Sequence, residues 1–171
     1  MRELARRAQV THGAPYRHFA DKNTLLAAIA EEGFTVLHTR LLTRQKKEGT
    51  DAIRHLRTLA EEVVEFAVER PFHYQLMFGN FWQDSKHKYP ALQEAAVGVF
   101  KILVGILDAC QNQGSVRKDY SAIELAVGSW SLAHGLSSLT IAGQLARDSK
   151  MAVKTSNQLA DMLLEGILLR D

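Results

Sequence analysis

Apolar residues recur every three or four positions along nearly the whole chain, which is the spacing that places them on one face of an α-helix. Only three of the 171 residues are proline, so few positions interrupt such helices. We find no stretch with the strict alternation of apolar and polar residues that is typical of a strand. The sequence therefore predicts an all-α fold.

Capping residues and prolines set the expected helix boundaries in the first half of the chain. Asp21 precedes a long periodic segment over residues 22–47, which basic residues and a glycine close. Thr50 or Asp51 caps the next helix. Pro71 ends that helix and can open the following one, because proline is tolerated in the first helical turn.

The second half carries a capping signal of its own. Ser121 and Glu124 have the spacing of a capping box, in which each side chain bonds the other residue's backbone N–H. The remaining expected helices are a short one around residue 5 that Gln9 and Val10 end, one capped by Thr11, an aromatic one over residues 72–82, one from Pro90 to Gly114, one from Ser121 to about Leu145 and one over residues 153–169.

The composition is that of an ordinary globular protein, with 46% hydrophobic and 23% charged residues. No apolar run approaches the ~18 residues that a membrane span needs, and the first residues lack the apolar segment of a signal peptide. We therefore expect a cytoplasmic protein without a membrane partner. Cys110 is the single cysteine and lies in an apolar helical pattern, which favours a packing role over a redox role.

Positive charge is concentrated at the N-terminus. The net charge of the chain is +2, but residues 1–22 carry +3 and the remaining residues carry −1, with histidines taken as neutral. A cluster of this kind is typical of a module that binds a polyanion.

Residues 4–19 have the features of a helix, a tight turn and a second helix. Ala5 and Ala8 are small enough for two helices to cross closely. Leu4, Val10 and Phe19 supply an apolar anchor for that crossing. In such a motif the second helix enters the major groove of DNA by its N-terminal end.

Three segments of this region resemble the DNA-binding signature of the TetR family of bacterial transcriptional regulators: LARRA at 4–8, VTHGAPYRHF at 10–19 and DKNTLL at 21–26. The resemblance implies a helix-turn-helix domain over residues 1–47, including a connecting helix over 22–47, and a C-terminal ligand-binding and dimerisation domain over residues 50–171. It also implies a ligand-responsive regulator, most commonly a repressor that a small apolar or aromatic effector releases from operator DNA.

The same resemblance assigns DNA contacts residue by residue. Tyrosine and lysine suit phosphate oxygens, whereas short side chains early in a recognition helix allow close approach to bases. The resemblance implies base contacts for Arg2, His12 and Ala14, phosphate contacts for Tyr16, His18 and Lys22, either kind for Arg17, a contact from Thr11 and close backbone approach at Gly13.

The chain departs from the family pattern in three places. Gln9 stands where the turn usually has glycine, so we expect Gln9 to adopt a left-handed backbone conformation. Ala14 replaces a common hydroxyl residue. The family's first helix is missing before Met1, which indicates a late start or a truncated chain. The apolar side of Leu4, Leu25 and Ile29 would then be partly uncovered, and we expect weak operator binding.

Two C-terminal segments resemble one TetR subgroup: PFHYQLMFG at 71–79 and WSLAHGL at 130–136. Aromatic and methionine side chains suit an apolar ligand, with a histidine as one polar anchor. The candidate ligand-binding residues are Phe66, Tyr74, Met77, Phe78, Phe81, Trp82, Phe100, Trp130 and His134. In each single case, ordinary core packing is the competing interpretation.

The last two expected helices are candidates for dimerisation. One is unusually rich in small residues, which permit close packing within or between subunits. The resemblance implies that these helices pair with their counterparts in a homodimer, which matches the two-fold symmetry of typical operators. The candidate interface residues are Ala126, Ser129, Ala133, Ser137, Leu159, Leu163, Gly166 and Ile167.

Two other functions compete with a regulator. The seven histidines include no zinc-binding pair, and the nucleophile-elbow, P-loop and dinucleotide motifs are absent, so we do not expect an enzyme or a cofactor. A pair of Cys110 and His134 has no support beyond composition. A helical ligand-binding or protein-interaction module without DNA-binding activity is the alternative function.

Overall fold

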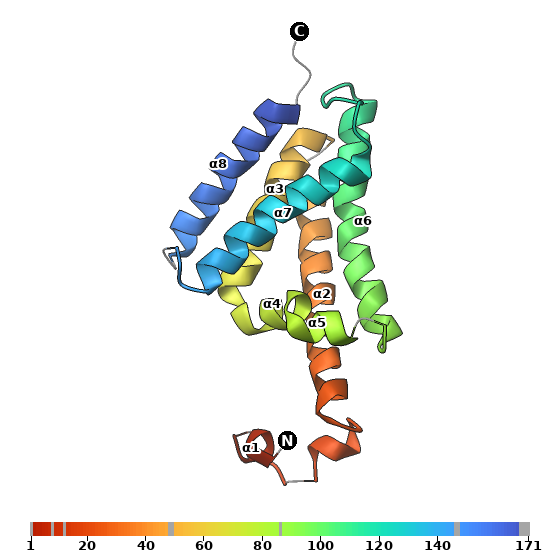
Figure 1. Ribbon diagram of the computed structural model, residues 1–171, viewed down its shortest axis with the longest axis vertical. Helices are drawn as coiled ribbons and strands as arrows, with labels where there is room; N and C mark the ends of the chain where they lie inside the picture. The colour runs from red at the N-terminus through yellow and green to blue at the C-terminus, as the bar shows by residue number, and fades with distance from the viewer. Residues whose placement is uncertain are drawn as a thin grey trace.

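Helix α2 (Lys22–Lys47) runs through much of the length of the molecule in the computed structural model, with the N-terminal module at one end and the remaining helices packed around its other part (Figure 1). The structure describes residues 2–7, 9–11, 13–47, 50–85, 87–145 and 148–167. Over these ranges the elements are helices without a β-strand, so the all-α expectation is confirmed.

The other elements follow in chain order. They are α1 (Arg2–Arg7), the 3₁₀ turn η1 (Pro15–Arg17), α3 (Ala52–Glu69), α4 (Pro71–Phe78), α5 (Asn80–Ser85), α6 (Pro90–Asn112), α7 (Ala122–Ile141) and α8 (Ser149–Ile167). Helix α2 packs against α3, α4 and α6, while α7 and α8 cover α3.

The caps expected at Asp21, Asp51 and Ser121 are confirmed. The Asp21 carboxylate accepts the backbone N–H of Thr24 at 2.7 Å, and the Asp51 carboxylate caps α3. Ser121 and Glu124 form the complete capping box at the start of α7. The hydrogen bonds from Ser121 hold the pKa of the Glu124 carboxyl below its usual value.

Some boundaries differ from expectation. The helix expected after Thr11 is reduced to the 3₁₀ turn η1, which the Arg17 N–H closes by bonding the Ala14 carbonyl at 3.2 Å. Helix α7 ends at Ile141, and α8 begins at Ser149, four residues before the expected start.

The expected aromatic helix is two helices, because the chain breaks at Gly79. Its N–H bonds the Gln75 carbonyl oxygen at 2.8 Å, and its backbone is then extended. A Cβ at this position would lie 2.4 Å from the same oxygen, so the break requires glycine.

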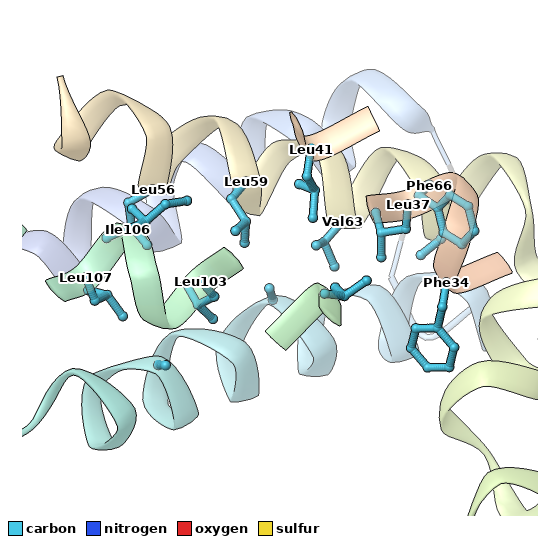
Figure 2. Close-up of a cluster of buried hydrophobic side chains, with 14 of the residues drawn as sticks. Phe34, Leu37, Leu41, Leu56, Leu59, Val63, Phe66, Leu103, Ile106 and Leu107 are labelled. Atoms are coloured by element: carbon cyan, nitrogen blue, oxygen red, sulfur yellow. The ribbon is translucent and has the colours of Figure 1, made fainter. Parts of the chain in front are cut away.

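The hydrophobic core lies where α2, α3 and α6 meet (Figure 2). Its larger members from α2, Phe34, Leu37 and Leu41, recur at helical spacing and face similar side chains of α3 and α6. The labelled members are Phe34, Leu37, Leu41, Leu56, Leu59, Val63, Phe66, Leu103, Ile106 and Leu107. Cys110 is also fully buried, and burial raises the pKa of its thiol to about 11, as a packing residue requires.

From the sequence we expected no segment apolar enough to span a membrane, and helix α6 differs from that expectation. Among the described residues it is long and apolar enough, by length and composition, to cross a membrane. However, it packs against α2, α3 and α7, and the core helix of a globular protein passes the same test. The length and composition of α6 are therefore weak evidence for a membrane span.

Helices α2 and α4 approach closely at Gly33. A Cβ on Gly33 would lie 2.5 Å from the sulfur atom of Met77, whose side chain is fully buried. Glycine at this helical position therefore allows the close crossing, despite its cost in helix propensity.

We predict that Gly33→Ala destabilises the protein by about 1 kcal/mol, because overpacking outweighs the gain in helix propensity. Gly105→Ala in α6 is the matched control, since a Cβ there meets nothing within 4 Å. We expect the control to be neutral or more stable than the wild type. Urea unfolding of both variants measures the difference, and equal effects would contradict the close crossing.

Candidate nucleic-acid interface and ligand cavity

The turn after α1 is closed by Gln9, whose φ of 55° is left-handed as expected from the sequence. The Gln9 N–H bonds the Arg6 carbonyl at 3.2 Å, and the Val10 N–H bonds the Ala5 carbonyl at 3.0 Å. These two bonds are the pattern of a Schellman motif, which glycine usually ends. The turn therefore has its expected geometry with an unfavourable residue at its left-handed position.

Most of the predicted DNA contacts are exposed on this module. Ala14 is half-buried, and η1 carries Tyr16, which is 48% exposed. Arg2 lies in α1, but its side chain is outside the described part of the structure, and His12 is outside the described residues altogether. The exposed candidates are Thr11, Gly13, Tyr16, Arg17, His18 and Lys22.

Gly13 is not required by the protein itself. Its φ is not in the left-handed region, and a Cβ on it would meet nothing within 4 Å. Backbone conformation and internal packing therefore leave an alanine acceptable here.

Two of the N-terminal arginines are engaged inside the module. Arg6 and Arg7 both pair with Glu3, at 2.6 and 2.9 Å. All three side chains are exposed, so each pair contributes little to stability. The pairs do, however, reduce the positive charge that α1 presents.

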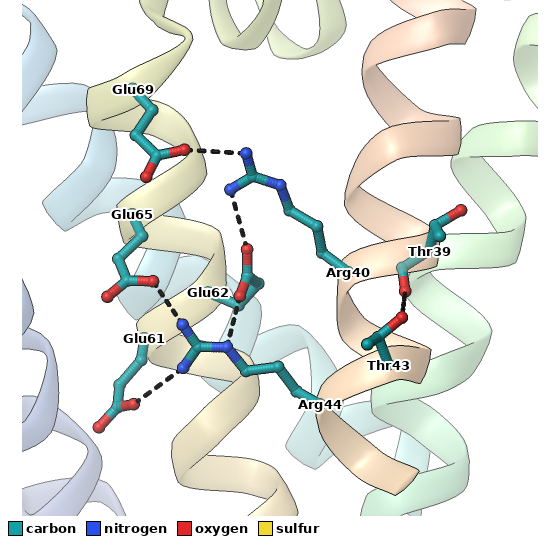
Figure 3. A network of polar contacts seen from close by, with 8 residues as sticks. All are labelled: Thr39, Arg40, Thr43, Arg44, Glu61, Glu62, Glu65 and Glu69. Atoms are coloured by element: carbon teal, nitrogen blue, oxygen red, sulfur yellow. Dashed lines mark hydrogen bonds and ion pairs between the residues drawn. The ribbon is translucent and has the colours of Figure 1, made fainter. Parts of the chain in front are cut away.

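Helix α2 is tied to α3 by a network of ion pairs (Figure 3). Glu62 is almost completely buried and accepts hydrogen bonds from Arg40 at 3.2 Å and Arg44 at 2.7 Å. Arg40 also pairs with Glu69 at 2.9 Å, and Arg44 pairs with Glu65 at 2.7 Å. Removing either arginine would therefore weaken the hold on a buried carboxylate.

An apolar cavity of about 300 Å³ lies beside α2. Its described walls come from α2, α4, α5, α6 and α7, and none of the lining side chains is charged. The lining residues are Phe34, Phe78, Trp82, Ala96, Val97, Val99, Phe100 and Trp130. This volume is at the lower end of the range for small-molecule sites.

The aromatic side chains around this cavity pack in specific pairs. The Phe34 ring meets Phe78 edge-on with centroids 5.1 Å apart, and it lies 5.6 Å from the Trp82 ring. Phe78 also lies 5.1 Å from Trp130. Helix α2, which leads to the N-terminal module, therefore contributes the Phe34 ring to the cavity wall.

The sequence identified only part of this wall. Phe78, Trp82, Phe100 and Trp130 line the cavity among the nine predicted residues, whereas Phe66, Tyr74 and Met77 are fully buried core and Phe81 packs on the core. Phe34 and the α6 residues Ala96, Val97 and Val99 were missed. Nothing local separates Phe34 from ordinary helix core, because its role depends on distant helices.

His134 sits behind the cavity wall, in a small polar cluster. Its Nδ1 is 3.0 Å from the Tyr74 hydroxyl, and its Nε2 is 3.3 Å from the Ser138 hydroxyl. The imidazole also stacks against Trp130. Burial lowers the pKa of His134 and raises that of Tyr74, so both side chains are neutral near pH 7. His134 is not among the described residues that line the cavity. Its contact with Tyr74 holds α4 against α7.

The predicted dimer residues of α7 need correction. Ala126, Ser129, Ala133 and Ser137 are buried inside the chain, so they offer almost no surface to a partner. The small residues let α7 pack within the subunit, which was one of the two possibilities. Ile167 of α8 is also buried, while Leu159 and Leu163 are half-buried and Gly166 is exposed.

The opposite side of α7 carries an exposed apolar surface, and α8 lies beside it (Figure 1). Large apolar side chains there are between 41% and 67% exposed. This exposed apolar face comprises Ile123, Val127, Leu132 and Leu139 of α7 and Met162 of α8.

Two family descriptions match the chain. Residues 56–166 match the tetracycline repressor-like C-terminal domain, and residues 1–29 match the bacterial regulatory proteins of the tetR family. No curated protein matches the chain.

Solved structures share the fold over nearly the whole chain. A protein of unknown function from Rhodococcus sp. RHA1 is 28% identical, with a TM-score of 0.81 over 98% of this chain and 84% of that one. A tetR-family regulatory protein from Rhodococcus RHA1 is 17% identical, with a TM-score of 0.79 over 99% and 86%. The regulator FadR from Bacillus subtilis, in complex with stearoyl-CoA, is 18% identical, with a TM-score of 0.80 over 96% and 87%.

The lowered pKa of His134 predicts a pH dependence of stability. The unfolded imidazole binds a proton at its ordinary pKa of about 6.5, whereas the folded one resists it, so its contribution is present above about pH 6.5 and is lost as the pH falls. We expect the free energy of unfolding of the wild type, relative to His134→Gln, to decline from pH 7.5 to pH 5. A pH-independent difference in urea unfolding would contradict the burial of the imidazole.

Proposed function

The chain belongs to the TetR family of bacterial regulatory proteins, and we propose that it is a repressor that leaves its operator when a small apolar or aromatic molecule occupies the cavity beside α2. It is thus a ligand-responsive, DNA-binding transcriptional regulator, a class of protein that is generally non-enzymatic and soluble. We place it in the cytoplasm, where its DNA target lies.

The observation that carries the proposal is the position of Phe34. This ring lines the cavity, yet it belongs to the same uninterrupted helix that begins at Lys22, next to the N-terminal module. A ligand that packs against Phe34 contacts the connecting helix directly. If the ligand binds one position of that helix more tightly than another, binding at the cavity is coupled to binding at the DNA-binding module.

The cavity walls favour a neutral, apolar effector. Five of the eight lining side chains are aromatic and the other three are alanine or valine. Such walls leave a charged group without a partner, which is costly in an apolar site. The ligand of the Bacillus subtilis regulator, stearoyl-CoA, combines a long apolar chain with a charged CoA group, and only the chain resembles the effector proposed here.

For DNA, we propose that Tyr16, His18 and Lys22 contact phosphates and that Gly13 lies against the duplex. The three side chains are exposed at the same end of the molecule. Since neither packing nor conformation in the protein requires glycine at 13, close approach of DNA supplies a reason for it. Arg2, Thr11, His12, Ala14 and Arg17 remain candidates from the resemblance alone.

We also propose a homodimer that buries the exposed apolar face of α7 and α8. Two helices from each subunit would form the contact, which is the arrangement that the resemblance implies. The interface then uses the face opposite to the small residues of α7, which are already packed inside the subunit.

We expect the neutral probe N-phenylnaphthylamine to weaken binding to the DNA that flanks the gene, by about 10-fold for a typical coupling between two sites. Trp82 and Trp130 are the two tryptophans of the chain and both line the cavity, so their fluorescence reports probe binding. Ala96→Phe fills the cavity, and we expect it to abolish both responses.

Ala91→Phe is the matched control, because Ala91 is an exposed residue of the same helix. Probe binding without a change in DNA affinity would refute release by this cavity. A response of Ala96→Phe equal to that of the control would place the probe elsewhere. DNA binding itself is judged by its steep decline with added salt.

For the dimer, we predict that the double variant Val127→Glu and Met162→Glu is monomeric at micromolar concentration, because charge is costly in a buried apolar interface. Phe72→Glu is the control, since Phe72 is 79% exposed on α4 and is not one of the residues of this face. Light scattering after size exclusion gives the mass. A dimeric mass for the double variant would refute the proposed face.

A further inference from the structure

The ion-pair network between α2 and α3 is short of positive charge. Arg40 and Arg44 face four carboxylates of α3, namely Glu61, Glu62, Glu65 and Glu69 (Figure 3). Glu62 is buried and paired with both arginines, whereas Glu61, Glu65 and Glu69 are more exposed. Two carboxylates of the network are therefore not neutralised by α2.

A polar groove of about 580 Å³ lies on the other side of these carboxylates. Glu65 and Glu69 form its α3 wall, and Lys150 and Lys154 stand one turn apart on its α8 wall. The other lining residues are Val153, Asn157, Gln158 and Asp161. No ion pair to either lysine is found among the described residues, so the groove separates two complementary rows of charge.

The register of α3 and α8 places these rows opposite each other. The two helices run antiparallel (Figure 1), and Arg57 pairs with Asp161 across them. Glu65 lies eight residues after Arg57 on α3. Val153, the neighbour of Lys154, lies eight residues before Asp161 on α8. One further turn in each direction brings Glu69 to the level of Lys150.

The groove and network are electrically balanced once Arg57, the partner of Asp161, is counted with them. Their five carboxylates are those of the four glutamates and Asp161, and their five cations are Arg40, Arg44, Arg57, Lys150 and Lys154. The two lysines supply the two charges that the network lacks, which favours an internal role for them.

We propose that Lys150 and Lys154 are second partners of Glu69 and Glu65, so that the start of α8 and the connecting helix α2 compete for the same two carboxylates. Glu65 and Glu69 are then positioning residues, because they set how firmly α2 is held. As α8 closes the groove, each lysine approaches a carboxylate already bound to an arginine. The two cations repel each other, so the stronger one contact becomes, the weaker the other is.

This inference rests on the proposed function for its consequence but not for its test. If α2 transmits effector binding to DNA, the start of α8 is a second input to the same helix. The pairing itself is a property of the folded chain, measurable without DNA or effector.

The test is a double-mutant cycle of Arg40→Gln and Lys150→Gln, which act on the common partner Glu69. Arg44 still holds the buried Glu62 in these variants, so we expect them to fold. Competition predicts that Lys150→Gln raises the equilibrium constant of unfolding about 2-fold more when Arg40 is absent than when it is present, at low salt. The excess should vanish in the Glu69→Gln background, a result that simple packing would not produce.

Lys101→Gln is the matched control, because Lys101 is an exposed lysine on α6, outside the groove. Additive effects of Arg40→Gln and Lys150→Gln would overturn the proposal, as would an excess that survives Glu69→Gln.

The second arm measures DNA affinity. We expect the pair Lys150→Gln and Lys154→Gln to change the affinity for the flanking DNA about 3-fold, and Lys101→Gln to leave it unchanged. Coupling in the cycle together with unchanged DNA affinity would overturn the competition for α2. Failure of the wild type to bind DNA would instead refute the proposed function, and the cycle would still decide the pairing.

Discussion

The buried face of α2 ties the rest of the structure together. From Ala27 to Leu41 this face packs into the core that α3 and α6 complete, so its burial supplies much of the hydrophobic stabilisation. The same stretch carries Phe34 into the cavity wall and Arg40 and Arg44 into the network with α3. A single element therefore holds the fold, lines the cavity and supports the N-terminal module.

Much of the secondary structure was predictable because its determinants are local. Asp21, Asp51 and Ser121 each satisfy backbone donors within three residues, and prolines mark the starts of α4 and α6. The left-handed Gln9 followed from the resemblance, because Gln9 stands where the turn of the TetR family usually has glycine. The break at Gly79 was missed, because a continuous apolar pattern gives no sign that the backbone is extended there.

The candidate sites were less predictable because they depend on which face each helix buries. Ala126 and Ala133 suit a contact within the subunit as well as one between subunits, and the sequence does not distinguish the two. The cavity wall combines residues from five helices, so Phe34 and Val97 carry no local signal of their role. The exposed half of α7 was recognisable only once its packed half was known. The order of the TetR signature, in contrast, is local, and the family followed from it.

The unequal burial of α2 has a consequence for its internal motions. Its first turn, from Lys22 to Leu26, is exposed or half-buried, whereas burial is complete around Phe34 and Leu37. Local opening costs least where few apolar contacts are lost, so backbone amides of the first turn should exchange with solvent hydrogen long before those of the middle. The middle of the helix is thus its most stable part, and its N-terminal end opens more readily. Contact with DNA at that end would then order the first turn and slow its amide exchange.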